Sequence, residues 1–153
     1  MRKFRNDRRL VFTTLLATTL MALGSCSKMC NSGYEGSRCN VLETTKFTGR
    51  WAAVDTPGNL LYVDTITQGA FSDIVLSSSF SAHHFNHSIN VAVHNDSLLT
   101  IPYQQPDNDS NFVQGSGIMS LDHQNITISY QLVMGPDSNK TIIQYGGNWV
   151  KQN

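Results

Sequence analysis

The sequence predicts an all-β domain: an eight-stranded antiparallel meander that closes on itself as a barrel, with a two-sheet sandwich as the alternative arrangement. Three observations predict this fold class. From Lys46 onward, apolar and polar residues alternate with the two-residue period of half-buried strands. Turn residues separate the alternating segments. After the signal peptide, no segment long enough to form a helix has the 3.6-residue period of apolar residues that a helix would show. The barrel is favoured because closure leaves no exposed strand edge.

The first 25 residues have the composition of an export signal. They contain five Lys and Arg residues against one Asp, and the 15-residue apolar run Leu10–Gly24 follows the basic stretch. A membrane-spanning helix needs about 20 apolar residues, so the run is better explained as the core of a signal peptide. We therefore expect residues 1–25 to be removed from the mature protein.

The residues at the end of the apolar run indicate a lipid anchor. Leu23-Gly24-Ser25-Cys26 resembles a bacterial lipobox, in which small residues admit the signal peptidase and the cysteine accepts the lipid. The resemblance implies that Cys26 is the lipidated N-terminus and that acyl chains hold the protein on a membrane. The expected location is the outer membrane, on its periplasmic face, with the cell surface as the alternative.

Two further cysteines follow at a short spacing. Because an exported chain reaches an oxidising compartment, Cys30 and Cys39 are expected to form a disulfide. Their segment, with Gly33, Tyr34 and Gly36 between them, resembles the last disulfide loop of an EGF-like module. A full module needs six cysteines and this chain has three. Residues 26–46 are therefore interpreted as a stapled spacer, without the calcium or receptor binding of a complete module.

The β domain is expected to span residues 47–153. Pro57-Gly58 fits a type II turn and Asn95-Asp96 a tight hairpin, while Gln104–Ser110 is the only long loop. These breaks divide the domain into eight strands. The expected strands are, in order, Phe47–Val54, Leu60–Gln68, Asp73–Ser79, Ser88–Asn95, Leu98–Tyr103, Asn111–Leu121, Ile126–Val133 and Thr141–Lys151.

Alternation also predicts which side chains point inward. Ile89, Val91 and Val93, for example, share one face of their strand. An eight-stranded barrel is either just filled by side chains or wide enough for one small ligand, and the sequence leaves both possibilities open. The expected inward set includes Trp51, Leu76, Val91, Ile101, Ile126, Tyr130 and Trp149.

A family resemblance enters at the first strand. Phe47-Thr48-Gly49-Arg50-Trp51 contains the Gly-x-Trp motif that opens the first strand in the calycin superfamily. The layout of lipobox, clipped EGF-like loop and small β domain resembles lipocalin-like lipoproteins of Bacteroidota. The resemblance implies a barrel closed at one end by Gly49 and Trp51, with Trp149 beside them. It places any pocket mouth at the opposite end, near the loop Gln104–Ser110.

Four histidines are the candidate metal ligands. His83, His84 and His87 are close together and His94 follows them. Adjacent residues of an extended segment point to opposite sides, and no carboxylate lies next to these histidines in the sequence. We therefore expect no metal site and no cofactor.

No catalytic residue is predicted. The chain lacks a Gly-x-Ser-x-Gly elbow, and its carboxylates are dispersed, with no pair placed by periodicity for acid–base catalysis. Three hypotheses follow. The favoured one is an interaction or structural module of the cell envelope, and the alternative is a barrel that binds a small apolar or sugar-like ligand. An enzyme comes third, and we predict that the protein is not one.

The charge of the mature chain limits its partners. Residues 26–153 carry six Lys and Arg against ten Asp and Glu, a net charge of −4, so no basic patch is available for nucleic acid. The expected partners are the membrane, through the anchor, and a small ligand or an envelope protein. Two Asp-Ser/Thr-aliphatic tripeptides resemble the O-glycosylation sites of Bacteroidota, which makes Thr65 and Ser97 candidate modification sites.

Overall fold

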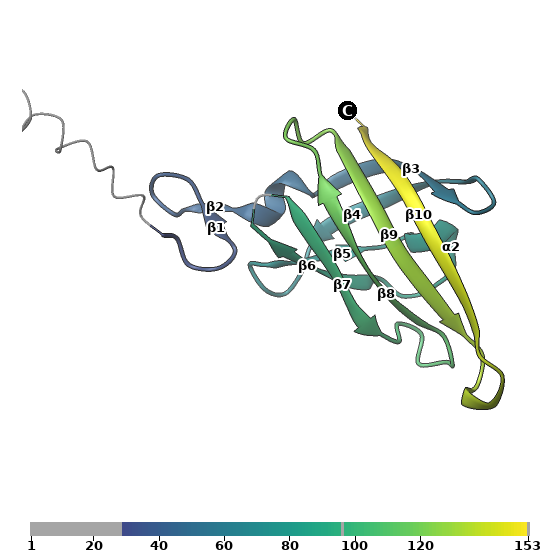
Figure 1. The fold of residues 1–153 in the computed structure, drawn as a ribbon. Coiled ribbons are helices and arrows are strands. Elements are labelled where there is room, and N and C mark those ends of the chain that lie inside the picture. Colours follow the sequence, from purple (N-terminus) through teal and green to yellow (C-terminus); the bar gives the residue numbers. More distant parts are fainter. Residues whose placement is uncertain (1–28, 96, 153) are drawn as a thin grey trace, which may run out of the picture.

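A computed structural model describes residues 29–95 and 97–152, and its main feature is a closed β-barrel (Figure 1). The eight strands follow one another around the barrel in chain order, and β10 closes it by pairing with both β9 and β3. Every neighbouring pair is antiparallel, which confirms the predicted meander barrel over the sandwich. The strands are β3 (Gly49–Thr56), β4 (Leu60–Gln68), β5 (Ile74–Ser77), β6 (Ile89–His94), β7 (Leu98–Gln104), β8 (Phe112–Met119), β9 (Asn125–Met134) and β10 (Thr141–Gln152).

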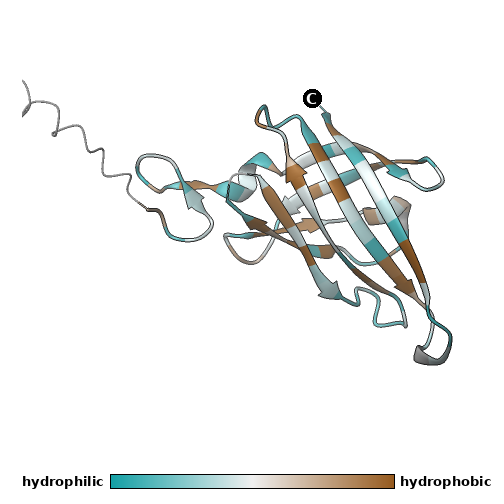
Figure 2. Cartoon of the chain, in the orientation of Figure 1, coloured by the Kyte–Doolittle hydropathy of each residue, from teal (hydrophilic) through white to brown (hydrophobic). Residues whose placement is uncertain are grey.

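The two-residue period places the barrel core as expected in most strands. Hydrophobic and hydrophilic bands alternate along the barrel wall (Figure 2), and the predicted inward face of β6, Ile89, Val91 and Val93, is buried. The prediction is wrong for Leu76, which is half-buried on the outer face, while Val75 and Ser77 point inward. The reason is that the run Ile74–Leu76 is apolar throughout and has no alternation to define its faces.

One end of the barrel lies around Trp51. This side chain is fully buried, and its indole Nε1 donates a hydrogen bond to the carbonyl oxygen of Phe47 at 2.8 Å. The ammonium of Lys151 lies 5.4 Å from the centre of the Trp51 ring, within cation–π range. Gly49 has a φ of 127°, which side-chain-bearing residues rarely adopt. The backbone therefore explains why the Gly-x-Trp motif has glycine at this position.

The predicted disulfide between Cys30 and Cys39 is confirmed. It closes a small hairpin of β1 (Tyr34–Glu35) and β2 (Val41–Leu42), which continues into the 3₁₀ turn η2 (Glu43–Lys46). The hairpin lies at one end of the barrel (Figure 1). Lys46 and Glu35 form an ion pair within the spacer, and the hydroxyl of the fully buried Thr44 in η2 donates a hydrogen bond to the side chain of Gln68 at the end of β4. The spacer is therefore held against the barrel at the Trp51 end.

The opposite end is covered by residues 78–88, between β5 and β6, which we call the lid. The lid contains the short helical turn α2 (Phe80–His83), in which Ser81 and Ala82 have left-handed backbone angles, with φ of 54° and 57°. Phe80 and Phe85 are buried. The sequence did not predict this inward fold, because the lid has neither a strand period nor a helical one. A second 3₁₀ turn, η3 (Asp137–Asn139), lies between β9 and β10.

Candidate functional site

A network of polar side chains lies inside the barrel, centred on the carboxylate of Asp55. Asp55 is fully buried at the end of β3. Its Oδ2 accepts hydrogen bonds from the phenol of Tyr62 at 2.7 Å and from that of Tyr130 at 2.6 Å, and its Oδ1 accepts one from Trp149 Nε1 at 3.0 Å. Strands β3, β4, β9 and β10 each contribute one side chain. Three donors therefore replace the water that burial removes from this carboxylate.

Burial determines the protonation of the two phenols. Desolvation, and then the hydrogen bond to Asp55, raises the pKa of Tyr62 far above its usual range. The same two causes, in the same order, raise the pKa of Tyr130. Both phenols therefore stay protonated and remain donors to the carboxylate at any physiological pH.

A second buried carboxylate, Asp64, lies on β4 and also points into the barrel. The hydroxyl of Ser77 donates to its Oδ2, and the backbone N–H of Ser79 donates to its Oδ1 at 2.8 Å. Burial raises the pKa of Asp64, and these hydrogen bonds oppose the shift only in part. Asp64 is therefore less acidic than a carboxylate in water.

The lid is bound to this inner cluster, by which we mean Asp55, Tyr62, Asp64, Tyr130 and Trp149. The backbone N–H of Ser81 donates to the Tyr62 oxygen at 3.2 Å, and Ser81 Oγ lies 3.0 Å from the Tyr130 oxygen. The ring of Phe80 makes edge contacts with Tyr130 and Trp149, at centroid distances of 4.6 and 5.7 Å. The lid thus reaches strands on the far side of the barrel.

Asp107, in the loop between β7 and β8, holds the outer part of the lid. Its carboxylate accepts hydrogen bonds from the backbone N–H groups of Asn86, at 2.8 Å, and His87, at 2.8 Å. The ring Nδ1 of His87 lies 2.9 Å from the same carboxylate. The Asn86 amide is the largest cause of a lowered pKa of Asp107. The predicted long loop therefore lies at the lid end, as expected, where it fastens the lid.

The sequence predicts dispersed carboxylates, and the structure corrects this prediction, because Asp55 and Asp64 both lie in the inner cluster. The alternation of residues in β3 and β4 nevertheless indicates that both carboxylates point inward. Asp55 follows Trp51 and Ala53 on one face of β3, and Asp64 lies between Tyr62 and Ile66 on one face of β4. Alternation alone would have placed both carboxylates inside the barrel, whereas their pairing with tyrosine hydroxyls depends on which strands face each other.

The structure does not bring the candidate histidines together. His87 pairs with Asp107, the carboxylate neighbour that the sequence did not reveal, and the His84 ring contacts Phe85. His94 is exposed on β6, and the side chain of His83 lies outside the described part of the structure. Over residues 29–95 and 97–152, no group of three or more His, Cys, Asp or Glu is placed to hold a metal ion.

The other predicted site residues are spread along the chain. Trp149 is buried as expected, but its ring contacts are with Tyr62 and Phe80, towards the lid. Thr65 is half-buried on the outer face of β4, beside the buried Asp64, and Ser97 is half-buried in the β6–β7 turn. Cys26 and the signal peptide lie outside the described residues. Among the residues described, no helix is long and apolar enough to cross a membrane.

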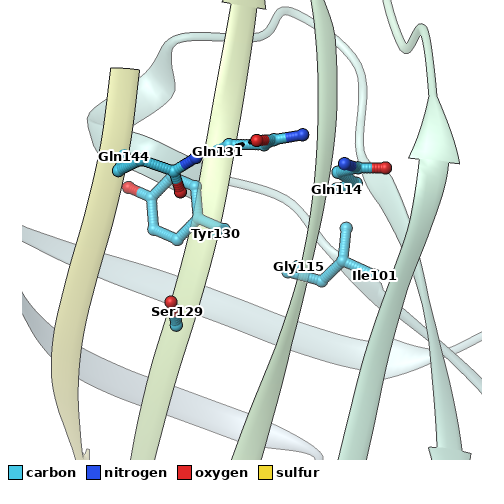
Figure 3. Close-up of a pocket in the computed structure, with 7 residues that line it drawn as sticks. All are labelled: Ile101, Gln114, Gly115, Ser129, Tyr130, Gln131 and Gln144. Carbon is cyan, nitrogen blue, oxygen red and sulfur yellow. Dashed lines mark hydrogen bonds between the residues drawn. The ribbon is translucent and has the colours of Figure 1, made fainter. Parts of the chain in front are cut away.

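A shallow groove lies on the outer face of the wall formed by β7 to β10. It has a volume of about 330 Å³, and we call it the glutamine groove because three glutamine side chains cross it side by side (Figure 3). Its lining residues are Ile101, Gln114, Gly115, Ser129, Tyr130, Gln131 and Gln144.

No protein-family model matches this chain, and a search of curated proteins finds no significant match. The function is therefore inferred from the chemistry of the inner cluster and of the outer surface.

Proposed function

We propose that this protein is a membrane-anchored envelope lipoprotein whose lipocalin-like barrel acts as an interaction module through its outer surface. The observation that carries this proposal is that the protein's own side chains fill the barrel interior and satisfy its polar groups. Both buried carboxylates already have hydrogen-bond donors from the chain itself, and Phe80 and Phe85 of the lid are buried at the end where a pocket mouth was expected. A partner would therefore bind to the outer surface of the barrel.

The membrane anchor is supported by the lipobox-like segment that ends at Cys26. The disulfide between Cys30 and Cys39 agrees with an oxidising compartment outside the cytoplasm. The outer membrane is the proposed location, with the periplasmic face as the favoured side.

The mass of the mature protein tests the anchor. Purification from its native host should give a chain that begins at Cys26 and carries acyl groups, and Cys26→Ser should move the protein from the membrane fraction to the soluble fraction. An unmodified thiol at Cys26 or an intact leader would contradict the anchor.

Photo-crosslinking in cells tests the interaction. A crosslinkable residue placed at exposed outer positions, such as Ile118 or Ile142, should capture an envelope component. Capture of nothing except the protein itself and membrane lipid, from every outer position, would reject the interaction module.

One observation favours a second function, the binding of a small ligand inside the barrel. The lid has two residues in left-handed conformations above a cluster of tyrosines, tryptophan and carboxylates, and displacement of Phe80 would expose these groups. A thermal-shift panel of lipids and sugars tests this function. A shift that Tyr130→Phe weakens would support it, and no shift with any compound would reject it.

A further inference from the structure

The glutamine groove is built from one row of aligned residues. In the sheet register, Gln131 of β9 lies directly opposite Gln114 of β8 on one side and Gln144 of β10 on the other. All three side chains lie on the outer face of the wall, and Figure 3 shows them side by side. The next pair of outward residues, Ser116 and Ser129, is also aligned, and both are exposed. The outer wall therefore presents a row of amides in the groove and, beside it, a pair of hydroxyls of which that of Ser129 lines the groove.

Much of the hydrogen-bonding capacity of this row of amides is unused. Gln144 Nε2 donates to Gln131 Oε1 at 2.8 Å, and Gln114 has no side-chain hydrogen bond to another described residue. Each amide has two N–H donors and a carbonyl oxygen with two lone pairs. The row consequently leaves both donors and acceptors free at spacings fixed by the strands, about 4.8 Å apart.

An aromatic pair borders the row. Tyr103 and Phe112 are stacked, with ring centroids 4.9 Å apart and an angle of 7° between the planes. Tyr103 is 54% exposed. Phe112 precedes Gln114 by two residues on the same strand and the same face, a distance of about 7 Å along the strand. A ligand on the amide row therefore has an apolar aromatic surface within reach.

The groove has no charge of its own. Its lining includes no Asp, Glu, Lys, Arg or His, and its one titratable group, the Tyr130 phenol, is buried and protonated. Binding of a nucleic acid would require Lys or Arg side chains to contact its phosphates. Binding of a peptide as an added strand would require a free sheet edge, and the closed barrel has none. Sugars combine neutral hydroxyls, which donate and accept, with apolar C–H faces that stack on aromatic rings.

We propose that the glutamine groove binds a neutral glycan chain, which hydrogen-bonds to the amide row and stacks against Tyr103. This proposal rests on the proposed function and specifies the partner of the outer surface. The groove is open to solvent on the outer face of the barrel, so a segment within a longer chain can lie in it as well as a chain end.

The test uses the full chain, purified in detergent, on an array of neutral gluco-, manno-, galacto- and xylo-oligosaccharides with acidic oligosaccharides as a comparison set. We expect binding to at least one neutral series. Gln131→Ala and Tyr103→Ala should each weaken that binding at least tenfold. Gln152→Ala, which removes an exposed glutamine at the end of β10 away from the groove, should leave it within twofold.

Two outcomes overturn the proposal: binding to none of the neutral series, or equal binding by the wild type and Gln131→Ala. Unfolding in urea, monitored by circular dichroism, confirms that the variants are folded. The crosslinking experiment separates the two levels of inference. If outer-wall crosslinking captures an envelope component while the array shows no glycan binding, the glycan proposal fails and the interaction module stands. If both fail, both are rejected.

Discussion

At the scale of single residues, Asp55 connects the parts of the barrel that are most distant in sequence. Its carboxylate accepts from Tyr130, 75 residues later, and from Trp149, 94 residues later. Each partner is a strong donor, and removing the acceptor would leave buried donors unpaired. Asp55 therefore helps specify which strands face one another across the interior.

The glycine pair on β10 gives a direct test of this packing. A Cβ on Gly147 would lie 2.0 Å from Asp55 Oδ1, whereas the nearest atoms to a Cβ on Gly146 are 3.9 Å away. Gly147→Ala should lower the free energy of unfolding by at least about 2 kcal/mol through overpacking and loss of hydrogen bonds at Asp55. Gly146→Ala, the matched control, should change it by less than about 1 kcal/mol.

Urea unfolding measures both variants. Equal stability of Gly147→Ala and the wild type would show that Asp55 does not occupy the position described.

Asp64 gives the protein a predictable pH dependence. Burial raises its pKa in the folded state above the usual 3.8, so the folded protein binds this proton more tightly than the unfolded chain does. The contribution of Asp64 to stability is therefore greatest below pH 3.8 and falls as the pH rises through the raised pKa. Asp64→Asn removes this titration.

The stability of Asp64→Asn relative to the wild type should therefore increase with pH from about 4 upwards, by at most about 1.4 kcal/mol per pH unit. Urea titrations at several pH values between 3 and 7 measure the difference. A constant difference would show that the pKa of Asp64 is the same in the folded and unfolded states.

At the scale of elements, the lid is the part of the fold under local strain. Left-handed backbone angles cost a residue with a Cβ about 1–2 kcal/mol, and the lid has two such residues in succession. Buried contacts of Phe80 and the hydrogen bonds to Asp107 offset this cost. The lid is therefore held by its partners and not by its own backbone preference.

A substitution by glycine tests this account. Ala82→Gly should raise the free energy of unfolding by about 0.5–1 kcal/mol, because glycine adopts the left-handed angles without steric cost. The control Ala92→Gly, in the extended strand β6, should lower it by about 0.5–1 kcal/mol. Destabilisation of similar size by both substitutions would mean that Ala82 is not strained.

At the scale of the whole molecule, the hairpin and the barrel differ in what stabilises them. Every residue of the described hydrophobic core comes from Phe47 or later, while the hairpin has two-residue strands and a disulfide. Replacing both Cys30 and Cys39 by serine should destabilise the hairpin by about 2.5–3 kcal/mol.

Hydrogen exchange measures this prediction. The amides of β1 and β2 should exchange faster in the double variant, and those of β9 and β10 should keep wild-type rates. Faster exchange throughout the barrel would instead show that the disulfide supports the whole fold.

The sequence predicted the barrel well because the evidence for it is local. Alternation and turn residues define each strand separately, and eight such strands in succession have few ways to bury their apolar faces. The lid depends on contacts between Phe80 and rings on β9 and β10, which no local pattern encodes. The glutamine groove likewise depends on register, since Gln114 and Gln144 are 30 residues apart in sequence and become neighbours only through β9.

The docking of the hairpin against the Trp51 end has a consequence for orientation. Only three residues separate Cys26 from Cys30, so the two cysteines lie at most about 14 Å apart along the chain. With Cys26 acylated as proposed, this short linker keeps the Trp51 end of the barrel close to the bilayer and directs the lid away from it. The barrel axis would then be roughly perpendicular to the membrane. The glutamine groove on the side of the barrel would be accessible to a polymer that runs parallel to the membrane surface.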